Sequence, residues 1–339
     1  MTVPLESRRI VIAGASSLLG AELKSLLEES RFAAADFRLV DEETAAGTLT
    51  EAGGEAAVIQ TVEEDSFDKS WVVFFAGSSA FTKANLALAK RSGAKIIDLS
   101  GELAGRPEVA TWLPKLSGIP PAGSPKAFTI PSASAEIIAR LAIALGPQKP
   151  AAISVAAFQP VSAAGKPGVE ELESQTGQLL SFQSVGKQIF DAQIAYSMLD
   201  RFGPSSNHSL SASLAVIRRE VASLLPPGAE SPAMQLLHAP VFYGATVAAC
   251  AFLDSNADLS SVGKLCADGG FALTDDSAAP SNVSTAGEIT LQLAPPAADP
   301  ARPGAFWFWA AADNLRLPAS NAVKLAESLL EEERASAGA

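Results

Sequence analysis

The chain has 339 residues, of which 48% are hydrophobic and 18% charged, and its formal net charge is −12 at pH 7. This length suits two domains with separate cores, and this charge disfavours nucleic acid and anionic membranes as partners. The opening residues are charged where a signal peptide needs an apolar run, and the apolar stretch APVFYGATVAACAFL is too short to cross a bilayer. We therefore expect a cytoplasmic protein.

The first third of the chain alternates strand and helix patterns. Short apolar runs predict strands at 8–14, 36–41, 69–77 and 94–101, and apolar spacings of three and four residues predict helices at 17–30 and 80–93. Strands that alternate with helices in this way form a parallel, doubly wound sheet.

The pattern changes near residue 130, where FTIPSASAEIIARLA predicts a strand end, a turn and the start of a helix. Longer strand-like runs follow at 151–162, 235–255, 288–296 and 305–315, separated by polar and Gly/Pro-rich stretches. They predict a second, α+β domain around a largely antiparallel sheet. Residues 318–335 predict a final helix, with Pro318 in its first turn.

The chain offers little for a metal or disulfide site. Cys250 and Cys266 are its two cysteines, and a cytosolic pair stays reduced. We expect both to be inert core residues, with a reactive thiol at Cys266 as the alternative. His208 and His238 are not spaced as metal ligands, so we expect no metal site. We interpret His208 as a solvated loop residue.

A glycine-rich turn, GASSLLG, joins the first strand to the first helix. Gly14 and Gly20 stand where such a turn needs a tight bend and close packing, but Ser17 replaces the glycine that lets a pyrophosphate approach. The turn therefore either binds a dinucleotide or is a packing turn that binds nothing.

An acidic run, Asp41–Glu43, ends the second predicted strand. Asp41 lies 21 residues after Gly20, where an acidic side chain accepts hydrogen bonds from an adenine-ribose hydroxyl. The three carboxylates would repel a 2′-phosphate, which favours NAD over NADP. The alternative is a solvated acidic turn.

Several stretches resemble the aspartate-semialdehyde dehydrogenase family. Besides the glycine turn, the resemblance is carried by FFAGSSAFTKANLALAKRSGAKIIDLSG, FQPVSAAGKPGVEELESQT, HAPVFYGA and ADNLRLPASNAVKLAE. Their order and spacing hold over nearly the whole chain. The sequence also resembles the Usg-type paralogues of this dehydrogenase, which have lost active-site residues.

The resemblance implies a Rossmann-type dinucleotide-binding domain of residues 1–130 with 316–339, and an α+β substrate and dimerisation domain of residues 131–315. It also implies a homodimer joined through the second domain. Trp307 and Trp309 would then lie either at that interface or in the sheet core. The NAD-binding residues it implies are Gly14, Ser16, Ser17, Leu18, Gly20, Asp41, Gly77, Ser100, Gly165 and Asn314.

The same resemblance implies that the family's chemistry is missing. The nucleophilic Cys position is Ala133, the acid/base His position is Ala245, and the substrate-carboxylate Arg position is His238. The phosphate-binding Arg position is Ala104, with Arg106 close by. Nucleophilic catalysis needs a nucleophile and a base within hydrogen-bond reach, and here both positions carry methyl groups.

A few polar residues remain around this vestigial site. The substrate-positioning Gln is kept as Gln159, and Ser132 and Ser134 flank the emptied position. A Ser–His pair with His238 is one alternative; the other is that the serines cap a helix and His238 merely replaces the Arg.

Three functions remain open from the sequence. The leading hypothesis is a non-catalytic or altered NAD-binding, dimeric paralogue that binds a small molecule or a partner subunit. The second is an active NAD-dependent oxidoreductase on a different small aldehyde or alcohol, since hydride transfer needs no covalent step. The third is a regulatory partner subunit of a genuine family enzyme.

Overall fold

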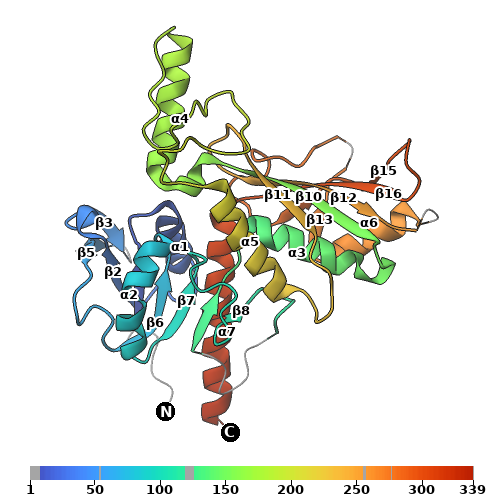
Figure 1. Cartoon of the computed structure of the whole chain (residues 1–339). Coiled ribbons are helices and arrows are strands. Elements are labelled where there is room, and N and C mark those ends of the chain that lie inside the picture. The colour runs from blue at the N-terminus through green and yellow to red at the C-terminus, as the bar shows by residue number, and fades with distance from the viewer. Residues whose placement is uncertain (1–7, 53–54, 119–125, 255–256, 276, 339) are drawn as a thin grey trace. The chain divides into compact units, whose positions relative to one another are not determined.

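A computed structural model describes residues 8–52, 55–118, 126–254, 257–275 and 277–338. The chain forms two compact units, one of Met1–Ser132 with Pro318–Ala339 and one of Ala133–Leu317 (Figure 1). Along the described part of the chain, no helix combines the length and apolar character that crossing a membrane requires.

The first unit is built on a seven-stranded sheet in the order β5-β2-β1-β6-β7-β9-β8, in which every neighbouring pair is parallel. A short antiparallel pair, β3 and β4, lies outside it. The strands are β1 Arg9–Ala13, β2 Asp36–Asp41, β3 Leu49–Ala52, β4 Glu55–Val58, β5 Gln60–Thr61, β6 Ser70–Phe75, β7 Lys95–Asp98, β8 Ala110–Thr111 and β9 Ala127–Thr129.

Helices cover both faces of this sheet. Alternate residues of β1 point to opposite sides: Ile10 packs with α1 (Leu18–Glu28) and α7 (Arg316–Gly338), and Val11 packs with α2 (Ser79–Arg91). Ser78 caps α2 by accepting the Phe81 N–H, and Gly93 follows the helix at a φ of +75°. A short 3-10 helix, Glu43–Ala45, follows β2. The prediction of a parallel, doubly wound sheet is confirmed.

The final helix α7 is tied to the sheet by one carboxylate. Glu333 accepts hydrogen bonds from Arg8 Nη1 at 2.7 Å, from Trp71 Nε1 at 2.9 Å and from Lys95 Nζ. Burial raises the pKa of Glu333, but these three donors outweigh it, and the net pKa lies below its ordinary value. The Arg8 side chain is only 7% exposed, so without Glu333 its charge would be buried and uncompensated.

The second unit contains a mixed sheet in the order β11-β10-β12-β16-β14-β13, with β15 added to β16. The pairs β10–β12, β12–β16, β14–β16 and β15–β16 are antiparallel, whereas β10–β11 and β13–β14 are parallel. The strands are β10 Ala152–Gln159, β11 Ala233–His238, β12 Ala245–Phe252, β13 Phe271–Leu273, β14 Leu291–Leu293, β15 Ala297–Ala298 and β16 Ala305–Ala312.

One face of this sheet is covered by α3 (Ala133–Leu145), α5 (Leu210–Leu224) and α6 (Leu259–Asp268), which share its apolar core. Helix α4 (Gly165–Leu180) stands away from that layer (Figure 1). Short 3-10 helices at Gly146–Gln148 and Val161–Ala164 flank β10. The expected α+β architecture of the second domain is confirmed.

We predict that Glu333→Gln lowers the free energy of unfolding by about 1–3 kcal/mol at neutral pH, because it leaves buried donors without their anion. Because the folded-state pKa is depressed, the loss should be full above the unfolded pKa of about 4.3 and should shrink as pH falls through the folded value. Urea denaturation of the wild type and of Glu333→Gln over a pH series measures this loss of unfolding free energy. Glu331→Gln, which breaks the exposed pair with Arg31, is the control and should cost less than about 0.5 kcal/mol. Equal costs for the two variants would contradict the anchoring role.

Candidate functional site

The glycine turn between β1 and α1 is shaped by close backbone contacts. Gly14 has a φ of +91°, and a Cβ at this position would lie 2.2 Å from Gly77 N. A Cβ at Gly20 would lie 2.2 Å from Gly14 O. Packing alone therefore requires glycine at positions 14 and 20, so the two glycines do not by themselves indicate a ligand.

Ser17 is the N-cap of α1. Its hydroxyl accepts the Gly20 N–H at 2.8 Å and donates to Ala76 O at 2.8 Å. Both bonds hold the hydroxyl toward the protein interior. The second bond also connects the glycine turn to Ala76, the residue after β6. The N–H groups of Leu18 and Leu19, in the same first turn, are the ones that a phosphate would use.

Asp41 closes the turn from the end of β2. The side chain is 7% exposed, its Oδ2 accepts the Ser16 N–H at 2.7 Å, and its Oδ1 accepts the Glu42 N–H at 2.8 Å. The alternative of a solvated acidic turn therefore does not hold for Asp41, although Glu42 and Glu43 are exposed.

Ser100 follows β7 at the same edge of the sheet. Its hydroxyl donates to Asp98 Oδ1 at 2.6 Å, and its carbonyl accepts the Ser79 hydroxyl at 2.9 Å. Asp98 is buried, and burial raises its pKa. Since the carboxyl ends of parallel strands share one edge, eight of the ten expected NAD-binding residues gather here: Gly14, Ser16, Ser17, Leu18, Gly20, Asp41, Gly77 and Ser100.

The other two expected NAD-binding residues, Gly165 and Asn314, lie in the second unit. Asn314 Oδ1 accepts the Gly244 N–H at 2.6 Å, and Asn314 Nδ2 donates to Ser162 Oγ at 3.1 Å. Gly165 begins α4 with a φ of +72°. Asn314 thus holds the turn before Ala245. Its partners Ser162 and Gly244 are not predictable from the sequence, because no local pattern signals their pairing.

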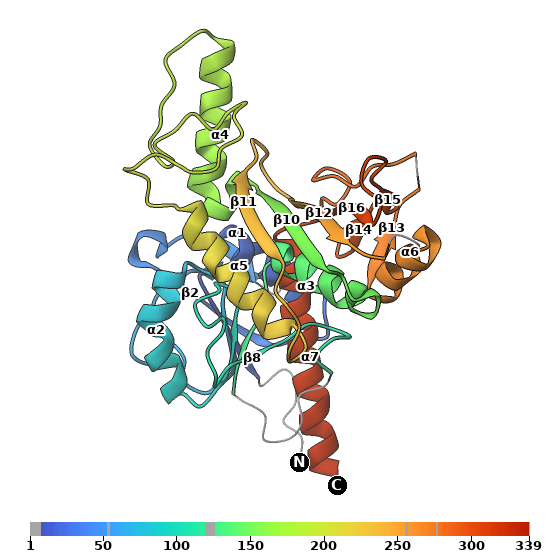
Figure 2. The same cartoon turned by 45° about the vertical axis from the view of Figure 1, so that its right-hand side comes forward.

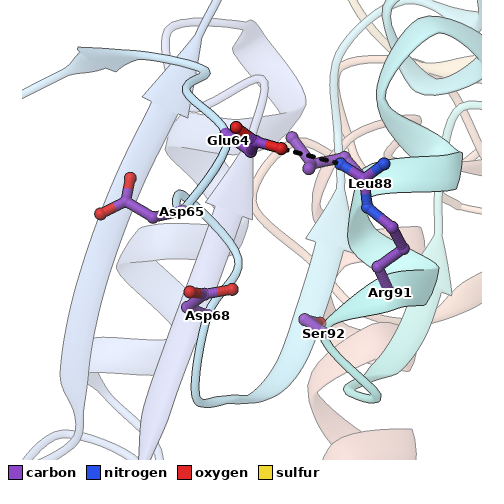
Figure 3. A pocket seen from close by; sticks show the side chains of 6 residues that line it. All are labelled: Glu64, Asp65, Asp68, Leu88, Arg91 and Ser92. Carbon is purple, nitrogen blue, oxygen red and sulfur yellow. Dashed lines mark ion pairs between the residues drawn. The ribbon is translucent and has the colours of Figure 1, made fainter.

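A surface depression of about 340 Å³ lies elsewhere in the first unit (Figure 3). The depression is lined by residues before β6 and by residues in and after the second half of α2, at the edge of the sheet opposite the glycine turn. These residues are Glu64, Asp65, Asp68, Leu88, Arg91 and Ser92. Glu64 and Arg91 form an exposed ion pair at 3.9 Å. Among the residues that the structure describes, no group of His, Cys, Asp or Glu side chains could hold a metal, here or elsewhere.

In the second unit, the two positions expected to carry the nucleophile and the base lie in the apolar core. Ala133 begins α3 and is 2% exposed; Ala245 begins β12 and is 1% exposed. Both belong to the same cluster of buried side chains. Ser134 is also buried, whereas Ser132 is half-buried.

His238 is enclosed by aromatic side chains. Its ring centroid lies 5.6 Å from that of Phe202 and 6.2 Å from that of Phe190, and its Nε2 lies 3.3 Å from Ile194 O. Burial lowers the pKa of His238, although the hydrogen bond with Ile194 opposes this effect. This environment favours the alternative that His238 merely replaces the Arg over a Ser–His pair. Gln159 is its half-buried register partner on β10.

The remaining candidate site residues are buried or contact other residues of the protein. Ala104 is buried, and Arg106 pairs with Glu102 in its own turn. Burial raises the pKa of both thiols, that of Cys266 to about 11, so neither forms a thiolate at neutral pH. His208 lies in a loop, but it is only partly exposed, and its ring packs 5.9 Å from Phe190.

Two family patterns cover most of the chain. Residues 9–119 match "Semialdehyde dehydrogenase, NAD binding domain", and residues 143–317 match "Semialdehyde dehydrogenase, dimerisation domain". The chain belongs to the semialdehyde dehydrogenase family. The resemblance found in the sequence is thus confirmed at the level of the family, together with its two kinds of domain.

Within this family, the chain is similar to proteins of two kinds. It is 28% identical to the USG-1 protein homolog of Azotobacter vinelandii over 96% of this chain and 98% of that protein. It is 23% identical to the aspartate-semialdehyde dehydrogenase of Rickettsia bellii, over 95% of this chain and 97% of that protein. Aspartate semialdehyde dehydrogenase II of Vibrio cholerae has the same fold, with a TM-score of 0.84, 21% identity and coverage of 96% and 99%.

We predict that acid destabilises this family member partly through His238. Because its pKa is lower in the folded than in the unfolded chain, stability is retained above the unfolded pKa of about 6.5 and is lost as pH falls below it. Between about pH 7.5 and about pH 5.5, the wild type should lose about 1 kcal/mol more unfolding free energy than His238→Phe, which keeps an aromatic ring but cannot titrate. Chemical denaturation at both pH values measures this; since burial also lowers the pKa of the more exposed His208, His208→Phe is measured beside it to separate the two contributions. Identical pH slopes for wild type and His238→Phe would contradict the prediction.

Proposed function

We propose that this chain is a non-catalytic, NAD-binding and dimeric member of the semialdehyde dehydrogenase family. The observation that carries the proposal is the burial of Ala133 and Ala245 in one apolar core. Covalent catalysis on an aldehyde needs a thiolate and a proton acceptor that are held together, and two methyl groups supply neither. His238, where the resemblance expects an Arg that binds the substrate carboxylate, is enclosed by Phe190 and Phe202.

Losing a nucleophile or its base costs about 10⁶ in rate in well-studied hydrolases. We therefore expect the purified protein to show no turnover of aspartate semialdehyde with phosphate and either NAD or NADP, measured by nicotinamide absorbance. A genuine family enzyme assayed in parallel shows that the substrate is competent. Turnover that scales with protein concentration would contradict the proposal, because it would require a working nucleophile elsewhere in the chain.

The residues at the carboxyl edge of the first sheet fit a dinucleotide. The N–H groups of Leu18 and Leu19 would bind the pyrophosphate, and Gly14 would let the backbone approach it. Bound nicotinamide would supply hydride chemistry. The Asp41 carboxylate, held by Ser16 and Glu42, would accept hydrogen bonds from the adenine ribose, and the acidic run would repel a 2′-phosphate.

We predict that NAD binds at least about tenfold more tightly than NADP, because of this negative charge. Calorimetry on wild type and on Glu42→Gln/Glu43→Gln tests the cause. The double variant should bring the two affinities about three- to tenfold closer and leave NAD binding unchanged, since both side chains are exposed. The matched control is Glu331→Gln/Glu332→Gln on α7, next to Glu333, which contacts Arg8 at the amino end of β1 and so at the opposite edge of the sheet. Tighter binding of NADP than of NAD by the wild type would contradict the prediction.

The proposed dimer uses the face of the second sheet opposite the helices. Side chains on this open sheet face come from the three central strands and are small or aromatic: Ala156, Phe158, Ala248, Trp307 and Trp309. Trp307 is 48% and Trp309 37% exposed, so the alternative that they form sheet core does not hold. Exposed tryptophans around an apolar centre are typical of a protein interface, and the dimerisation-domain match supports a second copy as the partner.

A further inference from the structure

The return segment, residues 186–208, lies between α4 and α5 and runs beside α4 in both views (Figures 1 and 2). The structure describes all of it, and it forms no helix or strand of its own. Without a continuous ladder of backbone hydrogen bonds, its position depends on individual contacts with the elements around it.

Helix α4 holds one side of the return segment. Gln175 Oε1 accepts the N–H groups of Ile194 and Ala195 at 2.8 and 3.1 Å. Glu171 Oε1 accepts the Phe190 N–H at 3.3 Å. Both α4 side chains are less than one-tenth exposed. This side of the segment is therefore fixed by an amide and a carboxylate that are both buried.

Strand β11 holds the other side through His238, its last residue. The His238 N–H donates to Leu199 O at 2.8 Å, and the Leu199 N–H donates to His238 O at 3.4 Å. The His238 ring packs against Phe190 and Phe202, and its Nε2 lies 3.3 Å from Ile194 O. One residue of the sheet thus contacts the segment through both its backbone and its side chain.

The second histidine of the chain packs against the same phenyl ring. The chain has two histidines, and the ring centroids of His238 and His208 lie 6.2 and 5.9 Å from that of Phe190. The His208 N–H donates to Ser206 Oγ at 3.1 Å, and the Ser206 hydroxyl donates to Ile189 O at 2.9 Å. Histidine is the side chain whose ordinary pKa lies between pH 5 and 8. The positive charge that side chains gain in mild acid is therefore concentrated around Phe190.

A protonated ring is unfavourable at either position. Burial lowers the pKa of both histidines, and at His238 it outweighs the opposing hydrogen bond with Ile194. The tilted phenyl ring of Phe190 attracts a cation only weakly compared with the hydration that the cation loses. Among the residues that the structure describes, no carboxylate forms an ion pair with either ring.

The charged groups on the neighbouring elements have other partners or lie on the surface. On α4, Glu171 accepts backbone N–H groups of the segment. On the segment itself, Asp191 Oδ2 accepts the Ser205 N–H at 2.9 Å. Asp200 pairs with Arg201 at 2.8 Å. Strands β10 and β11 contribute no charged side chain besides the histidine. The remaining charged residues of α4, α5 and the segment are the buried Glu220, which has a partner, and the exposed Lys166, Glu170, Glu173, Lys187, Arg218 and Arg219.

We infer that the two histidines act as a pH-sensitive latch: when both are protonated, the return segment detaches from β11, while both sheets stay folded. Each protonated ring then reaches water, which removes the cost of burying a cation. Both rings share Phe190, so protonation of one weakens the packing of the other. Strand β11 keeps its parallel register with β10 from Ala233 to His238, which confines the change to the segment.

Hydrogen exchange of the full-length chain tests the latch. Mass spectrometry of its peptides at about pH 7.5 and about pH 5.5 gives exchange rates, which are divided by the intrinsic rate at each pH. Protection of the Ile194 and Ala195 amides should fall at least about fivefold at the lower pH, because a proton bound at an ordinary pKa of about 6.5 favours opening by up to about tenfold there. Peptides from β1 and β12, one strand from each sheet, should keep their protection.

Protection of the segment that stays constant between the two pH values would overturn the latch. A loss of protection that extends equally to β1 and β12 would also overturn it, because the chain would then be unfolding as a whole.

A double variant tests whether the histidines are the cause. His208→Phe/His238→Phe keeps two aromatic rings that cannot titrate, and it should show the same protection at both pH values. The matched control is Glu170→Gln/Glu173→Gln, which removes two exposed titratable groups from α4 and should retain the wild-type drop. A double histidine variant that retains the drop would contradict the inference.

A second readout needs no variant. In proton NMR of the wild type, the Cε1–H signals of the two histidines should titrate together, with a shared midpoint below about 6.5, because opening exposes both rings at once. Two independent midpoints, one for each ring, would show that the histidines do not act together and would overturn the latch.

Discussion

The carboxyl edge of the first sheet depends on the approach of two backbones, at Gly14 and Gly77. Because β1 and β6 pair in parallel up to Ala13 and Phe75, the residues that follow leave the sheet side by side, and a methyl group on Gly14 would overlap the Gly77 amide. Ser17 and Asp41 complete the turn with hydrogen bonds to backbone atoms. The fold therefore needs these glycines whatever the turn binds. The case for a dinucleotide rests instead on the helix N–H groups, which suit a phosphate, and on the Asp41 carboxylate, which suits ribose hydroxyls.

The sequence was most informative where structure is set by neighbouring residues. The predicted strand at 36–41 coincides with β2, and the helix at 80–93 corresponds to α2 between the Ser78 cap and Gly93. The second unit was harder to predict, because β10 pairs in parallel with β11, some 80 residues later in the chain, and no local pattern specifies such a partner. The positions of α4 and α5 were not predicted, since Gly/Pro-rich stretches around them suggested connections.

In the candidate site, too, features set by the residue type were predictable, whereas features set by distant residues were not. The sequence predicts, through the resemblance, that Ala133 and Ala245 stand where the family has its nucleophile and its base. The burial of those positions, the bond from Ser17 to Ala76 and the enclosure of His238 come from tertiary contacts, which no local pattern specifies. Phe190 packs against both His208 and His238, and its N–H donates to Glu171 of α4. His238 thus packs against a segment that is bonded to α4.

The first unit is discontinuous in sequence, and this has a consequence for how the chain is made. Its core on one face of the sheet requires Leu325, Leu329 and Leu330 of α7 beside Ile10 and Ile12 of β1. A ribosome releases β1 long before it reaches α7, so the first strands must wait, with an open apolar face, while the whole of the second unit is synthesised. The chain of the second unit is therefore complete before that of the first, so during synthesis the second unit is the first for which every residue is present.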